Sequence, residues 1–181
     1  MILIIDMSWK RDSLGFFEFV QPILNVIEPI VKCTVKHYLE LTKRDLQQCS
    51  KVILSGTTLK DNSFLAESGK FKWLETFDKY VLGVCAGMEI MGKVFGAGLI
   101  QCAEIGMTPI STVAVNPLFS GSFSAYSLHG FCLEVSGDWR ILANSANCAQ
   151  AIKHKQKNLY GVLFHPEVRN PQILQRFVEL K

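Results

Sequence analysis

The sequence has little charge of either sign and no long apolar run. Of its 181 residues, 19% are charged, and the formal net charge is only +3. The basic residues are scattered, and we interpret the densest stretch, Lys153–Lys157, as a solvated hairpin tip. Proteins that bind nucleic acid usually present a dense basic face, and a membrane-spanning helix needs roughly 20 apolar residues. Nucleic acid and membranes are therefore not expected as partners.

Export signals and paired cysteines are also missing. Met1–Asp6 has neither the basic segment nor the small-residue cleavage site of a signal peptide. The six cysteines include no C-x-x-C pair, so the spacing typical of a zinc site is absent. Widely spaced cysteines without an export signal predict reduced thiols in the cytoplasm. We expect no metal and no cofactor.

What remains is an ordinary globular composition. Apolar residues make up 49% of the chain, which excludes disorder as the main state. A chain of this length buries about 70% of the surface that its unfolded state exposes, so it folds without a disulfide or metal. The length predicts one domain over residues 1–181.

The hydrophobic pattern predicts an α/β fold. Met1–Ile5 is a continuous apolar run, typical of a strand buried on both faces. Strands are also predicted at 31–35, 51–55 and 80–84, alternating with helices at 14–27, 42–48, 71–77 and 86–95. The alternation favours an open, mostly parallel sheet with helices on both faces. Thr42 is the expected N-cap of the helix 42–48.

The second half of the chain has a different pattern, with short strand-like pieces separated by turn residues. These pieces lie at 110–115, 123–128, 131–135, 141–143, 149–153 and 159–164. We interpret them as a small antiparallel layer that leads back to one more buried strand. A final helix is expected to begin with Asn170 as N-cap and Pro171 at its first position.

The fourth predicted strand ends in a G-x-C-x-G pattern. Gly83 and Gly87 flank Cys85, and a helix follows at once. A sharp strand-to-helix turn strains its central residue and needs small neighbours two positions away, which is the nucleophile-elbow pattern with cysteine in place of serine. The helix N-terminus also favours a thiolate. The alternative is a small buried apolar residue without chemistry.

A second polar pair follows the last predicted strand. His165 and Glu167 lie two residues apart, so in extended structure they point to the same side, with Pro166 fixing the backbone between them. A nucleophile needs a base, and the base needs a group that orients it. In open sheets, sites form outside the carboxyl ends of the strands, where Ser55-Gly56-Thr57, Cys85 and His165 are all expected.

Together the two motifs resemble those of the class I, or triad, glutamine amidotransferases. The stretch Gly161–Glu167, G-V-L-F-H-P-E, matches that family's base motif in full, and the elbow around Cys85 matches its nucleophile motif except at the last position. The resemblance covers essentially the whole chain and is strongest toward the glutaminase subunits of archaeal-type GMP synthases. It implies a flavodoxin-like fold of the amidotransferase type.

The resemblance also implies a mechanism. Cys85 attacks the side-chain amide of L-glutamine, His165 transfers the proton and Glu167 orients His165, through a γ-glutamyl thioester. Backbone N–H groups of Ala86 and of the Gly56-Thr57 loop form the oxyanion hole. Ammonia then passes to a separate synthase subunit, such as GMP synthase, because the 181 residues contain no synthase domain.

The substrate end of the site departs from the family pattern. Thr57 stands where the family's oxyanion loop usually has glycine, and it is strained there if that position needs a positive φ. Glu89 replaces the family's glutamine; it either lines the site, where it raises the pKa of Cys85, or faces solvent as a first-turn acid. Leu128, His129 and Gly130 are candidate substrate-binding residues. His129 is equally well explained as a strand-end histidine.

Three functions remain open from the sequence. The first is a glutaminase subunit that supplies ammonia to a partner. The second is a stand-alone γ-glutamyl hydrolase, suggested by Glu89 and Thr57. The third is a catalytically impaired regulatory subunit on the same fold, against which the intact Cys85, His165 and Glu167 argue.

Overall fold

A nine-stranded sheet runs through the computed structural model, which describes residues 1–181. Its strand order is β2-β1-β3-β4-β9-β8-β7-β5-β6. The first five strands in this order are parallel: β2 (Cys33–His37), β1 (Ile2–Asp6), β3 (Lys51–Leu54), β4 (Tyr80–Val84) and β9 (Leu159–Val162). The other four are antiparallel: β8 (Ala149–His154), β7 (Trp139–Asn144), β5 (Gly98–Thr112) and β6 (Ser122–Glu134).

Helices cover both faces of the parallel half. One face packs against a π-helical segment at Phe16–Val20, α1 (Gln21–Ile27) and α6 (Gln172–Glu179). The short helix α5 (Pro166–Arg169) contacts α1, α6 and β6. The other packs against α2 (Lys43–Gln48), α3 (Ser63–Ala66), a 3-10 helix at Ser68–Glu75 and α4 (Ala86–Val94). A short 3-10 turn, Tyr38–Glu40, follows β2. None of these helices combines the length and apolar character that crossing a membrane requires.

Each face has its own core, because β1 is apolar over its first four positions. Ile2 and Ile4 belong to one buried cluster, whereas Leu3 and Ile5 belong to the other. Alternate strand residues point to opposite faces, so a strand covered on both sides needs an unbroken apolar run. The predicted α/β fold and the doubly buried first strand are confirmed.

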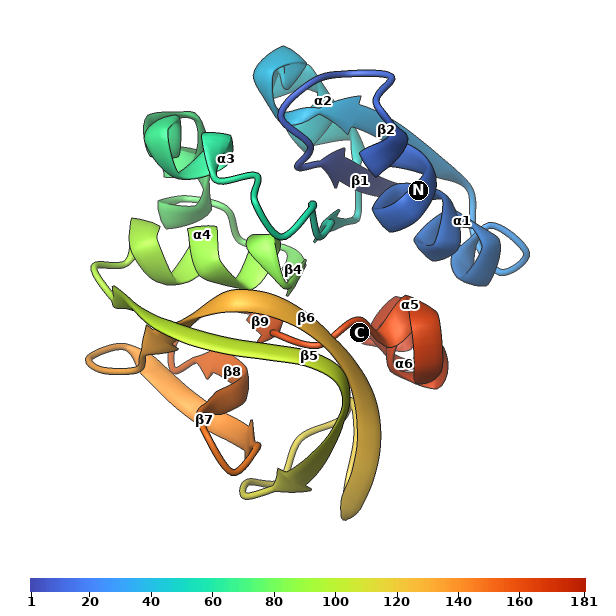
Figure 1. The fold of residues 1–181 in the computed structure, drawn as a ribbon. Coiled ribbons are helices and arrows are strands. Elements are labelled where there is room, and N and C mark those ends of the chain that lie inside the picture. Colours follow the sequence, from blue (N-terminus) through green and yellow to red (C-terminus); the bar gives the residue numbers. More distant parts are fainter.

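The antiparallel half leads back to the buried strand β9, as the sequence pattern predicted, and it continues the same sheet through the β8–β9 pair. Figure 1 shows the long β5–β6 hairpin curving across β7, β8 and β9. β5 begins at Gly98, twelve residues before the predicted 110, and β6 joins two predicted strands into one. The sequence pattern did not predict the first part of β5 because the strand contains Gly106 and Pro109, and both residue types usually interrupt strands.

Helix ends were predicted with mixed success. Thr42 caps α2 with a full capping box, as expected. The predicted helix 71–77 is a 3-10 helix over Ser68–Glu75. Asn170 is not the N-cap of α6; Pro171 holds that position, and Asn170 instead ends α5, a short helix that the sequence pattern did not reveal.

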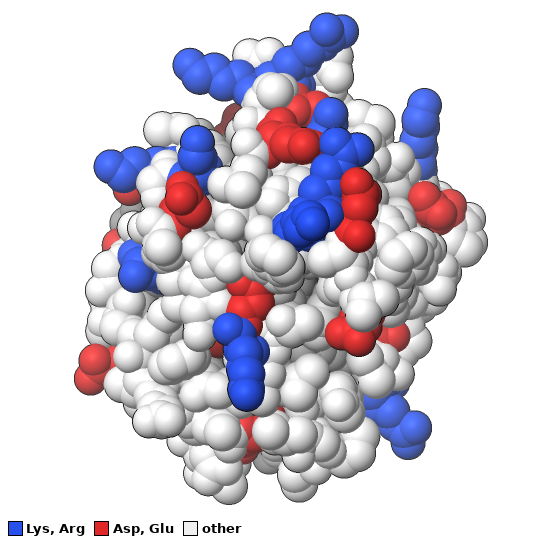
Figure 2. Space-filling model, turned by 45° about the horizontal axis from the view of Figure 1, so that its top comes forward, with Lys and Arg blue, Asp and Glu red and all other residues white.

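The carboxyl ends of β3, β4 and β9 lie side by side, because these three strands are neighbours in the parallel half. The three expected strand ends, at Gly56, Cys85 and His165, therefore share one edge of the sheet. Figure 2 shows basic and acidic side chains interspersed on the drawn face, with wide uncharged areas between them.

Candidate active site

Cys85 occupies a strained turn between β4 and α4. Its φ is 48° and its ψ is −106°, a backbone conformation that non-glycine residues rarely adopt. The turn is held from β9, where the Val162 carbonyl accepts the Cys85 N–H at 2.8 Å. The strain at Cys85 is the backbone geometry expected of a nucleophile elbow.

Both flanking glycines are required by close backbone contacts. A Cβ added to Gly83 would lie 2.4 Å from the carbonyl carbon of Gly87. A Cβ added to Gly87 would lie 2.6 Å from the carbonyl oxygen of Leu54 in β3. The elbow thus packs directly onto the neighbouring strand. Because these contacts require glycine at two fixed positions, the sequence pattern predicts the elbow.

The Cys85 thiol is buried at the N-terminus of α4. Its Sγ donates to the Leu128 carbonyl at 3.5 Å. Burial raises the pKa of the thiol, His165 opposes that rise, and Glu89 adds to it.

His165 and Glu167 form a buried pair. The Nδ1–H of His165 donates to Oε1 of Glu167 at 2.7 Å. The other ring nitrogen, Nε2, is buried and has no hydrogen-bond partner. Burial lowers the pKa of His165, but the Glu167 carboxylate and Cys85 together raise it well above its ordinary value.

The pair forms by a different route from the one that the sequence suggested. His165 is extended, with its N–H bonded to the Tyr126 carbonyl at 2.8 Å, but Pro166 starts α5 and places Glu167 in its first turn. The two side chains meet across a strand-to-helix junction and not along a strand. Phe19 packs against the imidazole, at 5.4 Å between ring centroids.

The loop after β3 contributes unpaired N–H groups. Gly56 and Thr57 donate to no backbone acceptor. Thr57 does not have a positive φ, so the strain considered for threonine at this position is absent. Its hydroxyl donates to Oδ2 of Asp61 at 2.7 Å.

Asp61 organises this loop, although the sequence pattern did not single it out. Its carboxylate also accepts the N–H of Trp9 at 2.6 Å and that of Ser63 at 3.1 Å. One carboxylate thus connects the segments after β1 and β3. The Asp61-Asn62-Ser63 run at the start of α3 is the usable signal, because Asp often bonds the N–H two residues later.

A narrow cleft joins the loop to the nucleophile. Its lining includes the predicted site residues Thr57, Cys85, Ala86, Glu89, Leu128, His129 and Gly130. The free volume is ≈ 20 Å³, which is room for about one water. A substrate larger than a water molecule needs a wider cleft.

Glu89 lines this cleft and does not face solvent, so the alternative of an exposed first-turn acid is wrong. Its side chain is 5% exposed on α4, one turn after Cys85. Burial raises the pKa of Glu89 to about 7. Near neutral pH, much of it is an uncharged acid that, like a glutamine amide, both donates and accepts hydrogen bonds.

His129 is not at a strand end but inside β6, and both its nitrogens are bonded away from Cys85. Nδ1–H donates to the Cys102 carbonyl at 3.0 Å, and Nε2 accepts from the Gln150 amide at 3.2 Å. This pattern fits a neutral ring, and burial lowers the pKa of His129. Glu104 lies 3.3 Å from Nε2. The sequence pattern did not reveal Glu104 or Gln150.

Comparisons with known proteins identify the family of the chain. The sequence pattern of the family described as "Glutamine amidotransferase class-I" matches residues 22–179. A glutamine-hydrolysing GMP synthase subunit of Pyrococcus abyssi is 30% identical over 145 residues, covering 72% of this chain and 75% of the relative. The protein of the same name from Methanosphaera stadtmanae is 37% identical over 98 residues, covering 50% and 52%.

Solved structures share the fold. A putative GMP synthase subunit from Thermoplasma acidophilum superimposes with a TM-score of 0.86 at 20% identity, covering 98% of this chain and 92% of the other. A glutamine amidotransferase from Thermotoga maritima gives 0.71 at 21% identity, covering 98% and 80%. At these identities the likeness establishes the arrangement of the chain alone.

Proposed function

The chain belongs to the class-I glutamine amidotransferase family, and from that premise we propose that it hydrolyses L-glutamine and passes the ammonia to a separate synthase subunit. The names of the Pyrococcus and Methanosphaera relatives favour GMP synthase as the acceptor enzyme. Residues 1–181 act in this proposal as a single amidotransferase domain. A cytoplasmic location suits its six unpaired thiols.

The buried, unpartnered Nε2 of His165 is the observation that carries the proposal. Nδ1 is fixed by Glu167, so Nε2 is the nitrogen that takes the thiol proton of Cys85. The sulfur attacks the side-chain amide carbon of glutamine, and the C–N bond breaks as His165 returns the proton to the leaving ammonia. Water, deprotonated by the same nitrogen, then cleaves the thioester to glutamate.

The oxyanion formed in both steps needs donors that are not already used. The Ala86 N–H at the start of α4 is one candidate, and the free N–H groups of Gly56 and Thr57 supply the other. Removing one such donor costs about 3–4 kcal/mol of transition-state stabilisation in well-studied enzymes. Glutamine binding opens the cleft next to Glu89, Leu128, His129 and Gly130.

Labelling with a diazo-ketone analogue of glutamine tests the proposal directly. We expect one adduct, mapped by peptide mass spectrometry to Cys85, blocked by excess glutamine and lost in Cys85→Ser and His165→Ala. Iodoacetamide reports the general reactivity of the other five thiols. Labelling of Cys85 no faster than of Cys33, with and without a GMP synthase partner, would contradict the proposal. Protection by γ-glutamyl peptides but not by glutamine would favour a γ-glutamyl hydrolase.

A further inference from the structure

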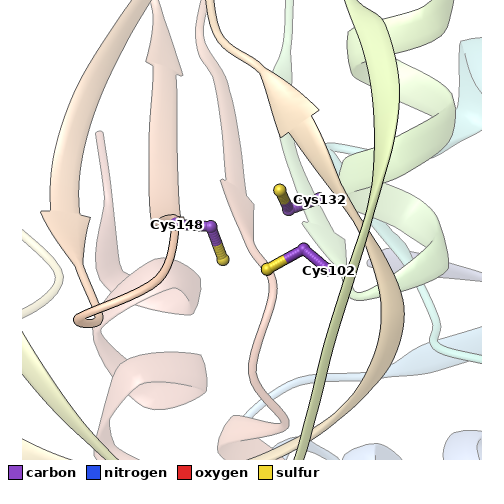
Figure 3. Close-up of side chains that lie close together, drawn as sticks. All are labelled: Cys102, Cys132 and Cys148. Atoms are coloured by element: carbon purple, nitrogen blue, oxygen red, sulfur yellow. The ribbon is translucent and has the colours of Figure 1, made fainter.

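Three cysteines that are far apart in the sequence meet inside the curved antiparallel half. Cys102 comes from β5, Cys132 from β6 and Cys148 from the turn before β8 (Figure 3). Their sulfur atoms all lie within 4.8 Å of one another, and none is in a disulfide. The proposed mechanism does not use this cluster.

A β-bulge in β5 directs the side chain of Cys102 into the three-cysteine cluster. The β5–β6 register shifts between Gln101 and Glu104, so two residues of β5 stand opposite one of β6. Ile100 and Gln101 both face solvent, and the inward positions then resume at Cys102 and Glu104. Without the extra residue, Cys102 would point outward.

The third sulfur, that of Cys148, is held in place by the turn before β8. The Cys148 N–H donates to the Ser145 hydroxyl at 3.2 Å, and its carbonyl accepts the Ser145 N–H at 3.0 Å. Gln150 donates to Sγ of Cys148 at 3.3 Å. The backbone therefore fixes the direction of this thiol before any ligand arrives.

The surroundings of the three-cysteine cluster favour a bound cation over unpaired thiolate anions. Three sulfur atoms and the carboxylate of Glu104 meet here, and Cys132 and Glu104 are both buried. A thiophilic metal supplies the missing positive charge and displaces the thiol protons as it binds. Zn–S bonds of about 2.3 Å place tetrahedral sulfurs about 3.8 Å apart, so small rotations of these side chains suffice.

A fourth ligand is next to the cluster. Glu104, His129 and Cys148 form a second group whose ligand atoms lie within 4.8 Å of one another. The Nε2 of His129 accepts from Gln150, whereas Oε2 of Glu104 lies 3.8 Å from Sγ of Cys148. We take the carboxylate of Glu104 as the candidate, because its oxygen already contacts one of the three sulfur atoms.

We propose that Cys102, Cys132 and Cys148 form a binding site for one thiophilic metal ion, Zn²⁺ or Cu⁺, with Glu104 as the fourth ligand of Zn²⁺. Thiolates select these ions over harder ones such as Mg²⁺. Cu⁺ is satisfied by the three sulfurs and leaves Glu104 free. The paired spacing of zinc motifs is absent because the sheet, not a local loop, assembles the site.

The site is connected to the glutamine cleft, and this part of the inference rests on the proposed function. The Cys102 carbonyl accepts from His129 at 3.0 Å, and the Gln150 amide contacts Cys148, Glu104 and His129. His129 lines the cleft beside Cys85. Contraction of the sulfurs around a metal thus shifts a wall of that cleft.

Metal titration of the full chain tests the site independently of turnover. We would work without oxygen in the Cys85→Ser background, strip metal with a chelator, and titrate Co²⁺ as an optical probe, then Zn²⁺ and Cu⁺ against competing chelators. The expected result is one equivalent bound, with thiolate-to-Co²⁺ charge transfer, the ligand-field bands of a tetrahedral ion and a higher Tm. Cys102→Ser and Cys148→Ser should each weaken binding at least tenfold, whereas Cys33→Ser and Cys49→Ser should not.

Further variants distinguish Zn²⁺ binding from Cu⁺ binding and keep the test decisive if one variant does not fold. Glu104→Gln should weaken Zn²⁺ at least tenfold and leave Cu⁺ unchanged. Cys132 is buried, so Cys132→Ala is used, and the two serine variants decide the outcome if it does not fold. Absence of the charge-transfer band, equal binding in Cys102→Ser, or a disulfide among the three in protein kept free of oxygen would overturn the proposal. Failed glutamine-analogue labelling with intact metal binding would overturn only the proposed function.

Discussion

A Cβ atom added to Gly56 would stand 2.6 Å from Cε1 of His165. The loop after β3 therefore packs directly against the proposed base, with only a hydrogen atom between them. Real Cβ atoms essentially never approach so closely, so either the imidazole or the loop must move to admit a side chain. This contact couples the oxyanion loop to the position of the base.

Gly56→Ala should therefore lower the kcat for glutamine hydrolysis at least tenfold while the fold is kept. The added methyl group displaces either the imidazole or the loop with the proposed oxyanion donors, and both proton transfer and oxyanion stabilisation are sensitive to such displacement. Steady-state kinetics and circular dichroism measure the two effects. Gly69→Ala is the matched control, because nothing lies within 4 Å of the Cβ added there. A kcat within twofold of wild type would contradict the coupling.

Glu89 should make the protein less stable as the pH rises. Burial raises the pKa of Glu89 from 4.5 to about 7, so between these values the folded state binds the proton more tightly than the unfolded state. Raising the pH through this window removes stability, at most about 3 kcal/mol from this group. Urea unfolding of wild type and Glu89→Gln at pH 5 and pH 8 measures it. The variant should gain relative stability at pH 8, whereas the exposed control Glu75→Gln should not.

The same residue should control glutamine affinity. Glu89 lines the cleft beside Cys85, where its acid form resembles a glutamine amide and its ionised form adds a negative charge. Glu89→Gln should change KM at least severalfold at pH 8 and flatten the dependence of KM on pH between 6 and 8. Unchanged KM at both pH values would remove Glu89 from the substrate site.

Local backbone demands explain which parts of the site the sequence predicted. The glycines around Cys85 are needed by contacts within one turn and with the adjacent strand, and Pro166 and Glu167 follow His165 directly, so each motif carries its own geometry. The parallel strand order then brings the motifs to one edge. Both the fold class and the residues gathered there followed from short stretches of sequence.

The remaining parts depend on long-range register. The burial of Glu89, the bonds of His129 and the meeting of Cys102 with Cys148 all follow from how the β5–β6 hairpin curves and where it bulges. A one-residue shift reverses the direction of every side chain in a strand, and no local pattern shows where such a shift occurs. The linear spacing of the cysteines accordingly argued against a metal, although the sheet brings three of them together.

Glu167→Gln should lower kcat roughly 100-fold or more, because the proposed base loses the charge that stabilises its protonated form. The Glu167 carboxylate is a main reason that the pKa of His165 is raised, so the variant should also lower that pKa. The pH dependence of Cys85 alkylation and imidazole NMR titration measure it. The exposed Glu179→Gln serves as control. A drop in kcat without any change in the pKa of His165 would assign Glu167 a purely positional role.

Thr57 offers a test of the oxyanion loop that leaves the backbone donors in place. Its hydroxyl bonds Asp61 at 2.7 Å, and Asp61 in turn holds the segments at Trp9 and Ser63. Thr57→Val keeps the shape but leaves a buried carboxylate oxygen with one donor fewer, at a cost of about 1–3 kcal/mol. We expect lower stability and a lower kcat in Thr57→Val, with both restored in Thr57→Ser.

Thr57→Gly separates this anchoring from backbone strain. Because Thr57 has no positive φ, glycine relieves no strain there and should loosen the loop as much as valine does. If Thr57→Gly instead raised kcat above wild type, threonine at this position would be hindering the oxyanion geometry. In that case the threonine that replaces the family's usual glycine would have reduced turnover. It would not be an alternative way of holding the same N–H group.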